Sequence, residues 1–526
     1  MTPLPRAERI ERLRGGDVLD VLVIGGGIAG AGIALEAAHA GARVALVEAN
    51  DFASGTSSRS SKLVHGGLRY LKQGRLGLTR ESVHERNALL RAAPGLVEPL
   101  PFLLPFHADT PGSRHVVGIG LAIYDAFAGQ RSRAWLEAAE MLRHAPILAS
   151  AGLRGGWRYL DATTDDARLT LRVLHESERA GALCLNYARV TDLLREGDTQ
   201  PVRGVRIEAE GEPAFEIAAR CVINATGCAA DALRGGLGLA PRLRPLRGSH
   251  LLFPAWRLPV AQAVALFHPD DARPVYAMPW EGATLVGTTD LDHQAPLDRA
   301  PSISHAEVAY LMRALHRQFP SLGLRADEAL CSWSGVRPVV SSNRDLPPSQ
   351  ENREHLIVTE QGLTTVSGGK LTTFRSTALQ VLAQLQAQLP MLRPRAADAA
   401  VFAPAPDAGA GAALPDWQHR RWRGRYGDGV AELAQQEIGA RAPIGSGVVC
   451  PAELRHVCRH ELVLHLDDLL LRRTRIGLTE AGAGEALLPG LRDLVCSELG
   501  WDASRWDAEH TRYRTLWSAQ HALPSA

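Results

Sequence analysis

The chain has 526 residues, more than one hydrophobic core usually supports, so we expect two or three domains. Its hydrophobic content of 45%, charged content of 22% and net charge of +1 are ordinary for a globular protein and give no reason to expect a nucleic-acid partner. The 7 cysteines form no C-x-x-C pair, so they indicate neither zinc nor a dithiol centre, and we expect no metal. No apolar signal region follows the N-terminus, which favours a cytoplasmic protein.

The first predicted elements form a strand–helix–strand unit. Val18–Ile24 is an apolar run followed at once by glycines, which predicts a buried strand entering a tight turn. Residues 28–40 are rich in alanine and lack proline, which predicts a helix closed by Gly41. Arg43–Val47 predicts a second strand that ends at Glu48. This order is that of a dinucleotide-binding unit.

A glycine loop at residues 25–30, Gly-Gly-Gly-Ile-Ala-Gly, joins the first strand to the helix. Gly25 permits the tight turn, Gly27 lets a pyrophosphate approach the backbone, and Gly30 lets helix and strand pack closely. The acid at position 48 can accept hydrogen bonds from an adenosine ribose, and its charge disfavours NADP. The glycine motif alone does not distinguish FAD from NAD as the cofactor. The residues expected to hold the adenosine half are Gly25, Gly27, Ile28, Gly30 and Glu48.

Later segments indicate a nucleotide domain assembled from separated pieces. Further short apolar runs occur at Cys221–Ala225, Thr284–Val286 and His355–Thr359. Because these runs are far apart, we expect a second domain to be inserted between them. Ala403–Pro415 is rich in Ala, Pro and Gly and predicts a linker. Pro451–Arg475 has helical periodicity and predicts a helix that Gly477 ends.

No stretch reaches the roughly 20 apolar residues that a membrane-spanning helix needs. The most apolar runs, Leu100–Phe106 and Val116–Phe127, are broken by prolines or by Asp125, which favours core or cap segments. A membrane-surface contact is the alternative for them, since it needs no spanning helix. Residues 6–14 could form one short basic amphipathic turn, although two glutamates dilute it.

The segment from Thr56 to Tyr70 reads TSSRSSKLVHGGLRY. Its hydroxyl groups and paired glycines make a polar loop able to cradle a phosphate and the edge of a flavin. This segment closely resembles the corresponding segment of the FAD-dependent glycerol-3-phosphate dehydrogenases. Further matches follow in family order: DDARL at 165–169, NATG at 224–227, RGSH at 247–250, GTTD at 287–290, SGVRP at 334–338, GGKLTT at 368–373 and RRT at 472–474. The combination is highly specific and extends over nearly the whole chain.

The resemblance implies a fold with three parts. These are an α/β FAD-binding Rossmann-like domain of the glutathione-reductase and D-amino-acid-oxidase type, an α+β substrate cap and an all-α C-terminal domain. We assign residues 16–75, 150–240 and 335–400 to the FAD-binding domain, residues 76–149 and 241–334 to the cap, and residues 401–526 to the helical domain.

The resemblance also implies an activity. It is the oxidation of sn-glycerol 3-phosphate to dihydroxyacetone phosphate by hydride transfer to FAD, with electrons passed to ubiquinone or another membrane quinone. The enzyme would be cytoplasmic and peripherally attached to the inner face of the cytoplasmic membrane, with a homodimer left open as its assembly. The alternatives are an oxidase of the same family, which reduces oxygen to hydrogen peroxide, and a flavin-binding regulatory module without turnover.

A phosphomonoester carries close to two negative charges, so its site needs several fixed cations. Matching to the family assigns the substrate site to Arg69, Tyr70, Arg337, Arg353 and Lys370. The match at Arg353 is looser, because the preceding stretch varies in length and Arg344 could take its place. Arg337 and Lys370 would also stabilise the alkoxide as it forms, which makes them catalytic candidates.

Oxidation of the alcohol also needs a proton acceptor, and histidine suits that task near neutral pH. His65 beside Gly66-Gly67 and His250 after Gly248-Ser249 are the two candidates, and the sequence does not decide between them. The family match implies further cofactor contacts at Ser60, Ser61, Lys62, His65, Gly66, Thr226, Gly227, Gly369, Leu371 and Thr372.

Overall fold

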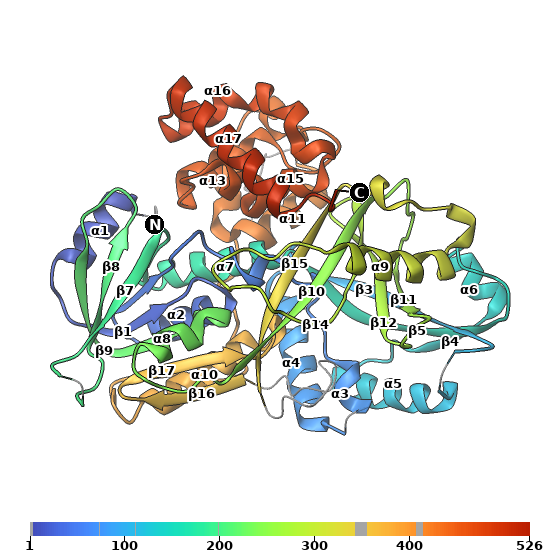
Figure 1. The fold of residues 1–526 in the computed structure, drawn as a ribbon, viewed down its shortest axis with the longest axis horizontal. Coiled ribbons are helices and arrows are strands. Elements are labelled where there is room, and N and C mark those ends of the chain that lie inside the picture. Colours follow the sequence, from blue (N-terminus) through green and yellow to red (C-terminus); the bar gives the residue numbers. More distant parts are fainter. Residues whose placement is uncertain are drawn as a thin grey trace.

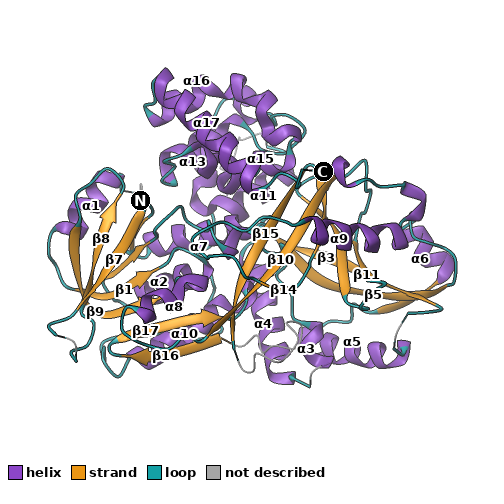
Figure 2. Ribbon diagram, viewed as in Figure 1, coloured by secondary structure: helices purple, strands orange, loops and turns teal. Residues whose placement is uncertain are grey.

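The computed structural model describes residues 4–72, 74–110, 112–197, 199–341, 355–406 and 414–525, without the side chains of Arg69 and Lys72. Two β-sheets lie side by side, and the C-terminal helices, red in Figure 1, lie over the junction between them. Figure 2 shows that strands make up the lower two parts, together with covering helices, whereas the upper part is helical.

The first sheet has eight strands among the described residues. Its main path is β16 (His355–Glu360), β17 (Leu363–Gly368), β9 (Phe215–Asn224), β1 (Leu19–Ile24), β2 (Val44–Val47) and β6 (Leu183–Leu185), and β8 (Gly204–Ala209) joins β9 to β7 (Ala188–Leu194). β1 pairs parallel with both β2 and β9. The strands predicted at residues 18–24 and 43–47 are therefore confirmed, and the run that starts at Cys221 forms the end of β9.

Helix α2 (Ile28–His39) connects β1 to β2 and confirms the predicted strand–helix–strand unit. Its alanines are buried and favour helix formation, and Gly41 follows its end at a φ of +89°. Helices α7 (Asp166–Arg179) and α10 (Phe374–Leu385) pack against α2. A Cβ on Gly32 would lie 2.6 Å from the Phe374 ring, so glycine at this point lets α10 approach closely.

Helix α1 (Arg6–Arg14) lies at the edge of the first sheet. Ile10 and Leu13 are buried in the same apolar cluster as the β7–β9 strands, and Arg9 pairs with Glu178. The apolar side chains of this helix therefore pack inside the protein and are not available for a membrane surface.

The second sheet has nine strands in the part of the chain that the structure describes. Its main path is β14 (Leu291–Asp292), β10 (Leu243–Pro254), β13 (Ala283–Gly287), β12 (Pro274–Trp280), β11 (Ala263–Phe267), β3 (Val97–His107), β5 (Leu153–Thr164) and β4 (Ala134–Glu137), with β15 (Cys331–Val340) paired to β10. The helices of this part are α3 (Leu68–Lys72), α4 (Leu76–Ala92), α5 (Arg114–Ala128), α6 (Ala138–His144) and α9 (His305–Gln318).

Two strands lie in a different sheet from the one their assigned ranges imply. β5 belongs to the second sheet, although we assigned residues 150–240 to the FAD-binding domain. β15 also belongs to the second sheet, and the assigned boundary at residue 335 cuts through it. Both strands pair with partners distant in sequence, β3 and β10, and local sequence patterns carry no information about such partners.

The C-terminal part is helical. It contains α11 (Asp416–Tyr426), α12 (Val430–Gln435), α13 (Pro451–His460), α14 (Leu466–Asp468), a π-helical turn at Leu469–Arg473, α15 (Ile476–Thr479), α16 (Leu488–Leu499) and α17 (Ala503–Gln520). The prediction of one continuous helix over Pro451–Arg475 is wrong. The chain leaves the helix at Leu462, which has a φ of +47° and whose carbonyl accepts a hydrogen bond from Asn186. Residues 407–413 of the predicted linker lie outside the described residues.

Buried ion pairs attach the helical part to the first sheet. Asp51, in the loop after β2, is buried and binds both Arg472 and Arg473, with 2.8 Å between Arg473 Nη2 and Asp51 Oδ1. Arg475 Nη2 lies 2.7 Å from Asp165 Oδ1 and 2.6 Å from Asp166 Oδ1. Burial alone would raise the pKa of Asp51, but Arg473 and Arg472 lower it to about 2.

We predict that Asp51→Asn destabilises the protein by up to about 3–5 kcal/mol, because it removes the buried carboxylate that Arg472 and Arg473 share and leaves Arg473 with the more distant Glu461. Urea unfolding of the FAD-bound protein, followed by circular dichroism at pH 7, measures this loss. Because the pKa of Asp51 is lowered in the folded protein, its ionised carboxylate stabilises the fold at pH values above the unfolded pKa of about 3.9. This stabilisation is lost as the pH falls through about 2. The difference in unfolding free energy between wild type and Asp51→Asn should therefore become smaller in acid. Glu216→Gln is the control, because its pair with Arg206 is exposed and screened by water, so its loss should change the stability little. An equal loss of unfolding free energy in the two variants would contradict a stabilising role for the buried ion pairs of Asp51.

Candidate active site

The glycine loop leaves space that side chains would fill. Gly25 has a φ of +114°, and a Cβ on it would lie 2.5 Å from the carbonyl oxygen of Ala225. A Cβ on Gly30 would lie 2.0 Å from the carbonyl oxygen of Gly25. These two positions therefore require glycine, and Gly27 is the N-cap of α2, where the helix dipole and N–H groups favour a phosphate. This geometry fits the pyrophosphate of a dinucleotide.

Glu48 directly follows β2 and lies beside this loop. Its Oε2 accepts a hydrogen bond of 2.6 Å from Gly26 N, and its Oε1 accepts one of 2.9 Å from Asn50 N. Burial raises the pKa of Glu48, and the two N–H groups act against this rise. A carboxylate offers about four acceptor positions, so Glu48 can shape the loop and still accept from a ribose hydroxyl.

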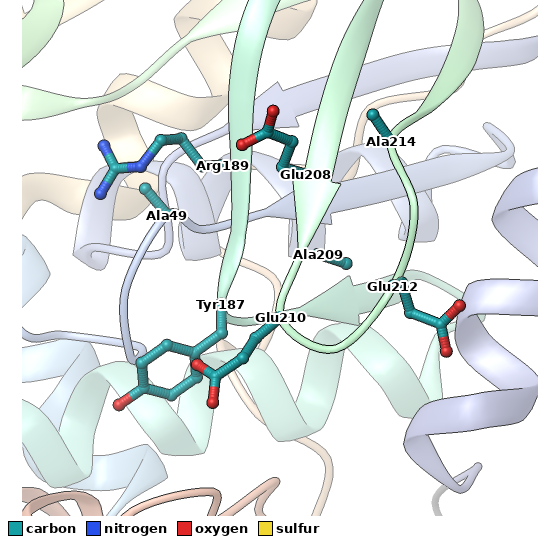
Figure 3. A pocket seen from close by; sticks show the side chains of 8 residues that line it. All are labelled: Ala49, Tyr187, Arg189, Glu208, Ala209, Glu210, Glu212 and Ala214. Carbon is teal, nitrogen blue, oxygen red and sulfur yellow. The ribbon is translucent and has the colours of Figure 1, made fainter.

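A pocket of about 400 Å³ opens directly after Glu48. Figure 3 shows it between the chain after β2 and the β7, β8 and β9 strands. Its lining residues are Ala49, Tyr187, Arg189, Glu208, Ala209, Glu210, Glu212 and Ala214. Its lining begins with the residue after Glu48, so the pocket has room for the adenine end of a dinucleotide bound at the glycine loop. Sequence reasoning missed these residues, because β7 carries no fingerprint and reaches this place only through sheet pairing.

The hydroxyl-rich segment is tied both to the loop and to α7. Ser57 Oγ accepts a hydrogen bond of 2.9 Å from Ile28 N, the first residue of α2, although Ser57 was not among the predicted contacts. Ser60 donates through both its N and its Oγ to Asp166 Oδ2, at 2.9 and 2.7 Å. Ser57 thus holds the segment at the helix N-terminus where a phosphate would bind.

Lys62 takes a different position from that expected of a cofactor contact. Its Nζ is buried, donates to Asp166 Oδ1 at 2.8 Å and lies 4.8 Å from the centre of the Trp333 ring. Burial lowers the pKa of Lys62 to about 8, and Asp166 partly opposes this effect. The ammonium group therefore serves the internal ion-pair network, and the prediction of a contact between this side chain and the cofactor gains no support.

The second half of the segment lies against the Gly-Gly-Lys motif. The backbone N and O of His65 both bind Thr372 Oγ1, at 3.1 and 3.2 Å. A Cβ on Gly67 would lie 3.0 Å from Lys370 Nζ, so the glycine at this point admits the lysine. Gly66 N donates to Tyr124 and Asp161 of the second sheet and its helices.

Lys370 connects the two sheets at this point. Its Nζ donates to Ser82 Oγ of α4 at 2.7 Å and lies 3.8 Å from the centre of the Tyr70 ring. A cation over an aromatic face is attracted by the ring quadrupole, which fixes the position of the ammonium group. The structure therefore brings together the predicted substrate residues Tyr70 and Lys370.

Arg337 of β15 is positioned by three of the family motifs. Its guanidinium lies 3.3 Å from Asp290 Oδ1 and 3.2 Å from Thr288 Oγ1. A Cβ on Gly248 would lie 2.3 Å from Arg337 Nη2, which explains the glycine in the RGSH motif. Thr56 Oγ1 donates to the carbonyl oxygen of the neighbouring Val336 at 2.5 Å, so Arg337 lies next to the start of the hydroxyl-rich segment.

His250 of β10 is buried beside the same segment. Its Nε2 lies 2.9 Å from Ser61 Oγ, and its ring stacks on Trp333 with 5.4 Å between ring centres. Burial, and then the positive charges of Arg337 and Lys62, hold the pKa of His250 well below its usual value. This imidazole is therefore neutral near pH 7 and only weakly basic.

The remaining predicted residues lie at the ends of the first-sheet strands or outside the described part. Thr226 Oγ1 donates to Asn224 Oδ1 at 2.7 Å, and Ser367 Oγ donates to the carbonyl oxygen of Gly227 at 3.3 Å. Gly369, with a φ of +74°, precedes the 3-10 turn Leu371–Thr373. Arg353 and its alternative Arg344 lie outside the described residues, as does the side chain of Arg69.

Comparisons with known proteins agree with this geometry. Residues 20–375 match the FAD dependent oxidoreductase family, and residues 368–506 match the C-terminal domain of alpha-glycerophosphate oxidase. The chain is 36% identical over 390 residues to the aerobic glycerol-3-phosphate dehydrogenase of Staphylococcus saprophyticus, which covers 73% of this chain and 70% of that protein.

Two solved structures share the fold. The glycerol-3-phosphate dehydrogenase from Bacillus halodurans complexed with FAD has a TM-score of 0.78 and 27% identity, and the match covers 98% of this chain and 97% of that one. The L-alpha-glycerophosphate oxidase from Mycoplasma pneumoniae with FAD bound has a TM-score of 0.59 and 17% identity, with 74% and 99% covered.

The glycine cradle, Glu48 and the family match together define an FAD-dependent enzyme. The chain belongs to the FAD dependent oxidoreductase family and, within it, to the group of aerobic glycerol-3-phosphate dehydrogenases.

We predict that Glu48→Gln weakens FAD binding by about tenfold or more, because an amide replaces one acceptor oxygen with a donor that faces a backbone N–H. The ratio of flavin to protein after gel filtration, and the FAD dissociation constant by fluorescence, measure the loss. Glu216→Gln, a change on an exposed part of β9, is the matched control and should keep its flavin. Full flavin retention in Glu48→Gln would show that the carboxylate does not serve the cofactor.

Proposed function

We propose that this enzyme oxidises sn-glycerol 3-phosphate to dihydroxyacetone phosphate and passes the electrons to a membrane quinone. The observation that carries the proposal is that two cations, Lys370 and Arg337, are each held in a fixed position beside the hydroxyl-rich segment. Two fixed cations suit a phosphate dianion, and the named relatives are glycerol-3-phosphate dehydrogenases.

Bound FAD supplies the hydride acceptor for carbon 2 of the substrate. The chain must hold the phosphate, align the C2–H bond and accept the proton of the C2 hydroxyl. Lys370 and Arg337 are the groups for the phosphate, and their charge also stabilises the oxygen as its proton leaves. The Tyr70 ring and Asp290 fix these two cations, so the site is arranged before the substrate enters.

We assign the proton acceptor to His65 and a positioning role to His250. A general base works best with a pKa near the operating pH, and the low pKa of His250 disfavours it. In its neutral form His250 Nε2 can instead accept from Ser61 Oγ and orient that hydroxyl. His65 lies on the segment beside Gly66-Gly67, and its backbone is held by Thr372.

Contact with a membrane is supported by α5. Val116, Ile119 and Ile123 are 68%, 63% and 36% exposed and recur at helical spacing. The only acid of α5, Asp125, is buried and pairs with Arg133, whereas Arg114 at the start of the helix is exposed. An apolar face with basic but no acidic exposed groups suits an anionic lipid surface. In the described residues no helix has the length and apolar character needed to cross a bilayer.

Oxygen is the competing electron acceptor, because the fold also matches an oxidase. We predict that sn-glycerol 3-phosphate bleaches the oxidised flavin band under anaerobic conditions. A soluble ubiquinone analogue should then restore the band much faster than oxygen does. An unbleached flavin would refute the substrate, and faster recovery with oxygen, with peroxide released, would establish the oxidase instead.

The role of the lysine is tested in the same assay with Lys370→Ala. The substrate concentration for half-maximal bleaching should rise by about tenfold or more, while FAD is retained, because only the phosphate loses a partner. Glycerol, which lacks the phosphate, is the matched control and should react equally poorly with both proteins. A loss of flavin equal to the loss of substrate affinity would mean that Lys370 serves the cofactor.

We predict that His65→Asn slows flavin reduction by about 10²–10⁴-fold near pH 7, the usual contribution of a general base. The slowed rate should recover as pH rises, because hydroxide can replace the base. His250→Asn should slow reduction less and leave the pH profile unchanged in shape. Rapid anaerobic mixing across pH measures both rates, and a flattened profile in His250→Asn alone would reverse the assignment.

We predict that Ile119→Ser combined with Val116→Ser reduces binding to vesicles of anionic phosphatidylglycerol, because it removes apolar surface from α5. Flotation with vesicles measures binding, and flavin reduction in solution should be unchanged. Ile438→Ser is the matched control, since Ile438 is 76% exposed in the C-terminal helical part. Equal binding of all three proteins would remove α5 from the proposal.

A further inference from the structure

Three potential metal ligands meet in the C-terminal helical part, outside the residues assigned to the flavin and the substrate. His456 and His460 are four residues apart on α13 and so project from one face of the helix. Glu432 reaches them from α12. Its Oε2 lies 2.9 Å from His456 Nδ1 and 2.8 Å from His460 Nε2, and all three ligand atoms lie within 4.8 Å of one another.

We propose that Glu432, His456 and His460 bind a divalent transition-metal ion of the zinc class. Two imidazole nitrogens and one carboxylate oxygen are a donor set that zinc accepts, with a water in the fourth position. Nitrogen ligands disfavour the hard ions Mg²⁺ and Ca²⁺. The scattered cysteines led us to expect no metal, and this site uses none of them.

Hydrogen bonding alone does not account for the cluster. His456 Nδ1 lies at hydrogen-bond distance and in hydrogen-bond geometry to Glu432. His460 Nε2 is as close to the same oxygen, so one carboxylate oxygen faces two imidazole rings at once.

An ion between the three side chains would be bound by all of them. A metal lies along the lone pair of an imidazole nitrogen at about 2.0–2.1 Å, so a second ligand of the same ion lies off the axis and about 3 Å from the nitrogen. The separations from Glu432 Oε2 to the two histidine nitrogens, 2.9 and 2.8 Å, are of this size.

The surroundings hold the ligands in place. A Cβ on Gly429 would lie 2.6 Å from His456 Cε1, so the glycine makes room for the ring, and Tyr426 packs edge-on against it. The nearby Arg459 is paired with Glu498 at 2.6 and 2.8 Å, and its Nη1 lies 3.7 Å from Glu432 Oε1, the oxygen that does not face the histidines.

The site also has an entrance. The side chain of His456 is only 7% exposed, whereas that of Glu432 is 35% exposed, so the cluster is anchored inside and open on the carboxylate side. A bound ion would join α12 to α13 across the loop between them, and it would stabilise the folded helical part by mass action.

The test uses the full FAD-bound protein, treated with a chelator and then titrated with Zn²⁺ in a calorimeter. Equilibrium dialysis with elemental analysis gives the number of ions bound. We expect one Zn²⁺ per chain that excess Mg²⁺ does not displace, and a rise in Tm with Zn²⁺. Glu432→Gln and His460→Gln should each weaken binding by more than about tenfold and abolish that rise. Both side chains are partly exposed, and flavin content reports whether the variants fold.

His510→Gln is the matched control. It removes a histidine of the same helical part that faces a single acid, Glu485, at 2.7 Å and has no second histidine. Zn²⁺ binding should be unchanged in this variant. The proposal is overturned if wild type binds no stoichiometric Zn²⁺, or if Glu432→Gln and His460→Gln bind it as tightly as wild type and the control.

Discussion

The structure depends on the neutralisation of two adjacent buried carboxylates, Asp165 and Asp166, at the start of α7. Arg475 contacts both of them, and Lys62 contacts Asp166. A buried ion costs several kcal/mol unless it is paired, so these four side chains must meet for any of them to be buried. Lys62 belongs to the hydroxyl-rich segment, the two aspartates to the start of α7, and Arg475 to the C-terminal helical part. One electrostatic requirement therefore holds these three parts of the chain together.

This requirement divides the cations of the family motifs into two groups. Lys62 is used internally, together with Arg475, and has no exposed surface. Lys370 and Arg337 lie instead where the two sheets meet, each held by a contact from the second sheet or its helices: Ser82 for the lysine and Asp290 for the arginine. The proposed phosphate site is thus part of the sheet junction, outside the internal ion-pair network.

The features that could be predicted from the sequence are those set by interactions between residues close together in the chain. The glycine loop, Glu48 and the first two strands follow from steric and hydrogen-bonding rules that act within about 30 residues, and the structure has them as expected. The internal role of Lys62 was not predictable, because it depends on Asp166, which is 104 residues away. The break in the helix predicted over Pro451–Arg475 has the same origin, since Asn186 binds the carbonyl of Leu462 across 276 residues. The residues of the candidate site could be predicted from the sequence mainly because their motifs resemble those of a known family.

The arginines at 472–475 also impose an order on biosynthesis. Asp166 leaves the ribosome 309 residues before Arg475, and Asp51 leaves it 422 residues before Arg473. Until about the last tenth of the chain is synthesised, Asp51 and Asp166 lack the arginines with which they pair in the folded protein. The final ion pairs of Asp51 and Asp166 therefore form only after the C-terminal helices have been synthesised.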